Sequence, residues 1–152
     1  SLGDDLVRSA AKLLRSPGIA VAHDAAVLLA SGRVRALHDP TEGGVATAIH
    51  ELAEGSSLGA EIQRNAIPVL PETRLICEHY GIDPLGLLSS GALLVAADPA
   101  GREDLRRAAE DGGVPLTWIG SFTTPDQGLS MVDDHGRQPI PRYDSDEITR
   151  VL

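Results

Sequence analysis

Two adjacent glycines, Gly43 and Gly44, stand between a polar kink and the clearest amphipathic helix pattern in the chain. Over 43–54 the apolar residues fall on one helical face and the polar residues on the other, which predicts a helix that Gly55 ends. A glycine inside a helix costs about 1 kcal/mol relative to alanine. Helix propensity therefore does not explain why two glycines stand at the start of this helix.

Two interpretations of the glycine pair follow from the residues. A helix start leaves backbone N–H groups without partners and carries a partial positive charge. Without side chains at Gly43 and Gly44, a phosphate can approach these amides, while Thr41 adds a hydroxyl donor and Asp39 caps the helix or orients a neighbouring group. The alternative is a turn that needs positive φ, or close packing of the helix. The residues alone leave both interpretations open.

The run Ser89-Ser90-Gly91 is a second candidate, because small hydroxylated residues there can line a pocket. An ordinary turn or bulge is the alternative, and the sequence favours it. Cys77, between Ile76 and Glu78, is expected to be a small packed apolar group. The scattered histidines suggest no metal site, so no metal ligands are predicted, and no catalytic residue can be assigned.

The order of the predicted elements favours an α+β fold. About four helices and five or six strands are expected, without strict βαβ alternation, which favours a mixed sheet layered with helices. A strand over 59–63 and a helix from Pro71 to about Tyr80 have the clearest boundaries. The apolar run 91–97 predicts a central strand buried on both faces, and 116–122 and 129–133 alternate like strands.

Length and charge narrow the class of protein. A chain of 152 residues is expected to form one domain. The net charge of −9 argues against nucleic acid or an anionic membrane as a partner. The longest apolar run is too short to cross a bilayer, and one cysteine excludes an internal disulfide, so a cytoplasmic protein is expected. The chain begins at Ser1 without Met, so a longer natural protein is expected.

Three stretches together resemble a known family. They are "HDPTEGGVATAIHELAEGSSLGAEIQRNAIPV", "GIDPLGLLSSGALLVA" and "LTWIGSF". They are similar to the C-terminal domain of the aminoimidazole ribonucleotide (AIR) synthase superfamily, over about 37–141, and within it to the HypE-like and AIR synthase-related groups. The resemblance implies a single AIR synthase C-terminal domain-like unit over 1–152. Its parts are a helical lead-in (1–32), a core (33–141) and a tail (142–152).

The resemblance also implies a function. Members of the superfamily use ATP to activate an oxygen or to phosphorylate a substrate. Their N-terminal domain binds magnesium and most of the nucleotide and forms the dimer, and that domain is absent from this chain. The expected partners are therefore its own N-terminal domain and a second copy of the full-length protein. The chain alone is expected to bind neither ATP nor magnesium tightly, and not to catalyse.

The resemblance supplies candidate contacts to phosphate or substrate. They are the residues of its glycine-rich turn, Asp39, Pro40, Thr41, Gly43 and Gly44. The second candidate segment adds Ser89, Ser90 and Gly91 to the predicted contacts. The resemblance and the electrostatic argument for the glycine pair thus point to the same turn.

One departure from the family limits the expected chemistry. HypE-like proteins end in Pro-Arg-Ile-Cys, whose cysteine carries the reacting group, whereas here Pro141-Arg142 is followed by Tyr143. Tyrosine cannot replace a thiolate in that role. An ATP-dependent AIR synthase-related enzyme of unknown substrate is therefore expected. The alternatives are a stand-alone ligand-binding or regulatory module and a structural domain that supports a dimer. In the structural domain the glycine turn would be covered, with no cleft.

Overall fold

The computed structural model of the protein describes residues 2–152. Within them the helices are α1 (Asp4–Leu13), α2 (Ala22–Ala30), α3 (Gly44–Ser56), α4 (Pro71–Tyr80) and α5 (Arg102–Asp111). The strands are β1 (Val34–His38), β2 (Gly59–Gln63), β3 (Leu94–Ala97), β4 (Gly120–Thr123), β5 (Leu129–Asp133) and β6 (Gly136–Pro139). The predicted α+β fold is confirmed.

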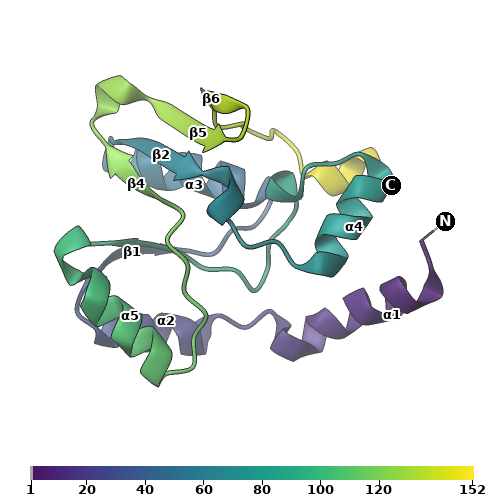
Figure 1. Ribbon diagram of the computed structural model, residues 1–152, viewed down its shortest axis with the longest axis horizontal. Helices are drawn as coiled ribbons and strands as arrows, with labels where there is room; N and C mark the ends of the chain where they lie inside the picture. The colour runs from purple at the N-terminus through teal and green to yellow at the C-terminus, as the bar shows by residue number, and fades with distance from the viewer. Residues whose placement is uncertain (1) are drawn as a thin grey trace.

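The strands divide between two sheets. In the four-stranded sheet the order is β4-β2-β5-β6, with β2 antiparallel to β4 and parallel to β5. The other sheet contains only β1 and β3, which are antiparallel. Figure 1 shows the larger sheet with α3 behind it, the helices α2 and α5 on the far side of β1, and α1 leading away from them toward α4.

Each sheet has its own hydrophobic core. The first core joins α3 to β2 and β5 through Ala46, Ile49, Ile62 and Met131, all buried. The second core lies between α2 and α5 and the β1–β3 pair, and its buried members are Leu28, Leu105, Ala109 and Val114. Leu28, in the predicted helical lead-in, is therefore part of the second core.

The prediction of a central strand over 91–97 is wrong in two respects. β3 is only four residues long and pairs with β1 alone. All four of its residues are half-buried rather than buried. The physical reason is the division of the sheet: Val95 and Ala97 pack against the second core, while Ala96 lines a cavity of about 490 Å³ between β1, α3 and β4.

Two further boundaries differ from the sequence pattern. The predicted strand over 116–122 begins only at Gly120, because Leu116 and Trp118 pack against the second core instead of joining a ladder. The hairpin strand β6 was not predicted. It pairs with β5 after a turn that places Gly136 at φ +111°.

Helix α3 continues past Gly55, which the sequence predicts as its end. Ser57 takes the left-handed conformation instead, with φ +54°. The Leu58 N–H donates to the Ala53 carbonyl and the Ser57 N–H to the Glu54 carbonyl, which is the hydrogen-bond pattern of a Schellman end. The ordinary glycine position of that motif is thus occupied by serine.

Among residues 2–152, no single helix is long and apolar enough to span a membrane. Only the bent pair Asp4–Gly18 and Ala22–Ala30 reaches the necessary length and hydropathy together.

Candidate functional site

The pairing of β1 with β3 brings the two predicted segments to one end of the small sheet. His38, the last residue of β1, lies opposite Leu94, the first residue of β3. Because the strands are antiparallel, the chain that leaves β1 over 39–44 and the chain that enters β3 over 89–91 extend from the same end. The sequence identified both segments but not their proximity.

Backbone geometry explains why the turn before α3 contains two glycines. Gly43 and Gly44 are buried and have φ angles of +74° and +61°, which L side chains rarely adopt. A Cβ on Gly44 would lie 2.5 Å from the Leu85 carbonyl oxygen and 2.9 Å from the Leu87 nitrogen. A Cβ on Gly43 would meet the side chain of Thr47. The two glycines therefore let α3 approach the 3₁₀ turn Pro84–Gly86.

The Gly44 amide is not free to bind a phosphate, as one of the two interpretations of the glycine pair requires. Its N–H donates to the Thr41 carbonyl at 3.0 Å. The Gly43 carbonyl accepts from the Thr47 N–H at 3.3 Å, which begins the helical hydrogen bonding. The need for positive φ and close packing accounts for the two glycines, and the Gly44 N–H is already hydrogen-bonded. A phosphate contact at this turn stays a prediction.

The exposed surface of the turn is polar. Pro40 is buried, whereas Asp39, Thr41 and Glu42 are exposed. Just before the turn, His38 Nε2 lies 2.5 Å from a carboxylate oxygen of Glu51 on α3. The side chains that this turn offers to a ligand are therefore a hydroxyl and two carboxylates.

The Ser89–Gly91 segment is an ordinary tight turn in its hydrogen bonding. The Ser89 hydroxyl donates to the Leu87 carbonyl at 2.8 Å, and the Ala92 N–H donates to the Ser89 carbonyl at 2.9 Å. Gly91 has φ +97° and packs against the backbone of Gly18. Ser90 and Gly91 are exposed. The Ser89 hydroxyl is used in the bond to Leu87, so Ser90 carries the hydroxyl that this turn presents to solvent.

Sequence reasoning missed a polar cluster that ties the tail to the body. One guanidinium nitrogen of Arg64 lies 2.9 Å from both carboxylate oxygens of Asp83. The Asp83 N–H in turn donates to Glu147 at 3.0 Å. Burial and the carboxylate of Asp83 raise the pKa of Tyr143. No sequence spacing relates positions 64, 83 and 147, so only the tertiary structure reveals this cluster.

The remaining candidates behave as packed or solvated groups. Cys77 is buried, and burial raises the pKa of its thiol, followed by the effect of nearby Asp83. Across residues 2–152, no three side chains of the His, Cys, Asp or Glu type lie close enough together to hold a metal ion.

The match to a protein family agrees with this fold. The model for "AIR synthase related protein, C-terminal domain" matches residues 5–132. Since the match covers most of the chain, the protein belongs to this family. The resemblance predicted from the sequence is thereby confirmed.

Particular relatives are HypE proteins. Carbamoyl dehydratase HypE of Rhizobium leguminosarum bv. viciae is 34% identical over 113 residues, which cover 72% of this chain and 32% of that protein. The crystal structure of Escherichia coli HypE, a hydrogenase maturation protein, has a TM-score of 0.72 at 28% identity and covers 84% of this chain and 41% of that one. A HypE structure in complex with ATP has a TM-score of 0.69 at 25% identity over 83% and 40%. The chain thus spans about a third of the length of the curated relatives that it matches.

Proposed function

We propose that this chain is the substrate- and phosphate-side domain of an ATP-dependent AIR synthase-related enzyme, and that it does not catalyse alone. The observation that carries the proposal is the family match over residues 5–132, in a family whose solved relatives include a HypE bound to ATP. The chain spans about a third of such relatives, so the rest of the catalytic apparatus would belong to another domain. That domain and a second copy of the longer protein would be its partners.

The residues of this chain do not by themselves fit a magnesium–nucleotide site. The described residues hold no group of three potential metal ligands, and the Gly44 amide is already hydrogen-bonded. ATP and magnesium would therefore be held mainly by the other domain.

The two turns at one end of the β1–β3 sheet are the proposed contact region. Thr41 and Asp39 would face the phosphate or substrate, because both are exposed. Pro40, Gly43 and Gly44 would act indirectly by fixing the backbone of the turn. The Ser89, Ser90 and Gly91 segment would complete the region from the other strand, with Ser90 as the exposed hydroxyl.

The test is a calorimetric titration with MgATP of the 152-residue chain and, in parallel, of the longer natural protein that contains it. We expect saturable binding by the longer protein and no measurable binding by the chain alone, because residues 2–152 hold no group of three potential metal ligands. Tight nucleotide binding by the isolated chain would contradict the proposed division of labour.

A variant of the exposed turn tests the site within the longer protein. Thr41→Val should lower ATP turnover by about tenfold, as expected when a hydrogen bond to a charged group is lost, while the unfolding midpoint stays unchanged. Thr117→Val is the matched control, since Thr117 is exposed and outside both turns. Equal ATP turnover in the two variants would show that the Thr41 hydroxyl does not contact the phosphate or substrate.

A further inference from the structure

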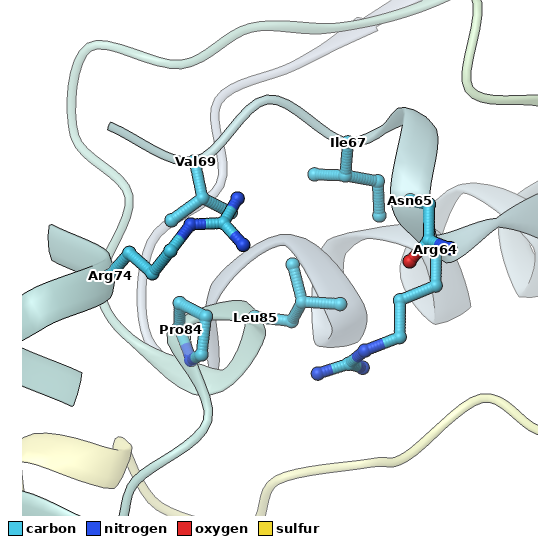
Figure 2. Close-up of a pocket in the computed structure, with 7 residues that line it drawn as sticks. All are labelled: Arg64, Asn65, Ile67, Val69, Arg74, Pro84 and Leu85. Carbon is cyan, nitrogen blue, oxygen red and sulfur yellow. The ribbon is translucent and has the colours of Figure 1, made fainter. Parts of the chain in front are cut away.

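A cavity separate from both turns lies between four segments of the chain. It has a volume of about 260 Å³ and is lined by Arg64, Asn65, Ile67, Val69, Arg74, Pro84 and Leu85. These residues come from the turn after β2, the connector to α4, α4 itself and the 3₁₀ turn Pro84–Gly86. Figure 2 shows the Arg74 side chain extending from α4 in the direction of Val69, and the Arg64 side chain on the other side of Leu85 in this view.

The two arginines at this cavity differ in their charge balance. Arg64 is neutralised by Asp83, at 2.9 Å from both carboxylate oxygens. No carboxylate among residues 2–152 lies within ion-pair distance of Arg74, although acidic residues outnumber basic ones by 22 to 13. Nine of the 13 basic residues do form such pairs. Arg74 is exposed to solvent and forms no ion pair among residues 2–152, and the cavity lining contains no acidic residue.

The rest of the lining is apolar with one amide. Ile67 and Leu85 are buried at 8% and 3% exposure, and Val69 is half-buried. Asn65 adds a side chain that both donates and accepts hydrogen bonds. Pockets for drug-sized ligands are usually about 300–1,000 Å³, so this one is suited to a smaller molecule. A guanidinium beside aliphatic walls complements a charged group attached to a short hydrocarbon part.

We propose that this cavity binds a small organic anion, with its carboxylate or phosphate on Arg74 and its apolar part against Ile67, Val69 and Leu85. The site is separate from the ATP-dependent function proposed above, and its test does not depend on that function. Asn65 would supply the second polar contact. Arg64 would keep the wall in place through Asp83 and would not bind the anion directly.

The test is an NMR titration of the nitrogen-labelled 152-residue chain with isobutyrate, with inorganic phosphate and with the uncharged isobutanol. We expect isobutyrate to give saturable shifts of the Asn65, Val69 and Arg74 amides, with a Kd on the order of 1–10 mM for so small a ligand. Phosphate should bind more weakly because it lacks the apolar part, and isobutanol should not saturate because it lacks the charge.

Matched variants decide the role of Arg74. Arg74→Gln should weaken isobutyrate binding by about tenfold, the effect of losing one charge-assisted contact. Arg74→Lys should restore part of the affinity. Arg15→Gln removes an exposed charge outside the cavity and should change nothing. The proposal is overturned if isobutyrate does not saturate, if phosphate or isobutanol binds as tightly, or if Arg74→Gln binds like the unaltered chain.

Discussion

At the scale of single residues, the glycine pair shows how one sequence feature admits two physical explanations. Gly43 and Gly44 lie at positive φ, and the backbone of Leu85 and Leu87 occupies the place of a Gly44 side chain. Gly55, in the same helix, has an ordinary helical conformation and open space around it. We therefore expect an alanine at these two positions to change the stability in opposite directions.

A pair of glycine variants tests this difference. Gly44→Ala should lower the free energy of unfolding by about 2–4 kcal/mol, because the new Cβ needs both a strained φ and displacement of backbone. Gly55→Ala should raise it by about 0.5–1 kcal/mol, because alanine favours the helix. Urea denaturation of the two variants measures both values. A Gly44→Ala chain as stable as the unaltered protein would mean that the turn relaxes at little cost.

At the scale of elements, a short 3₁₀ turn holds together segments that are far apart in sequence. The turn Pro84–Gly86 contacts α3 at Gly44 and borders the small cavity through Pro84 and Leu85. Asp83 caps it by accepting from the Leu85 N–H at 2.9 Å and also binds Arg64. The position of this turn thus depends on the Asp83 carboxylate, which both caps the turn and pairs with Arg64.

The Asp83 carboxylate should accordingly matter more than other ion-paired carboxylates. Asp83→Asn should lower the free energy of unfolding by about 1–3 kcal/mol, because it leaves a half-buried Arg64 without its counter-charge. Asp104→Asn is the control. Asp104 pairs with Arg33, and both side chains are more than 40% exposed, so a loss below about 1 kcal/mol is expected. Thermal or urea unfolding compares them, and equal losses would contradict the argument.

At the scale of the whole molecule, the C-terminal tail is part of the packed structure. Tyr143 and the stem of Glu147 occupy the space beside Gly86, within 2.8 Å and 2.7 Å of where its Cβ would lie. Glu147 also accepts the Asp83 N–H. The tail therefore packs against the same 3₁₀ turn that α3 contacts.

Removal of residues 143–152 should destabilise the whole chain. The loss of Tyr143 packing and of the Glu147 hydrogen bond should cost about 2–4 kcal/mol, mostly through exposed apolar area. For a chain of this size the melting temperature should fall by roughly 5–15 °C. Removal of 151–152 alone is the control, because Leu152 is 97% exposed. A tail deletion that melts with the unaltered chain would show that the tail is only loosely attached.

Local chemistry made several elements predictable. Pro71 suits the first turn of α4, and Gly81, at φ +66°, ends it, as the sequence indicated. The strand β2 has the predicted bounds. The end of α3 was not predictable in the same way, because Ser57 adopts a conformation for which glycine is the usual choice. At the candidate site, the sequence identified the two turns but neither their shared sheet end nor the bonded state of the Gly44 amide.

The family, the α+β class and the positions of most helices and strands could be predicted from the amino-acid sequence, because they depend on residue patterns and local backbone preferences. The tertiary structure decided which strands pair, that two small sheets replace one, and which glycine approaches which backbone. It also brought positions 64, 83 and 147 into one polar cluster. Such contacts join residues distant in the chain, and no local preference encodes them, since they depend on how the whole surface of each element is buried.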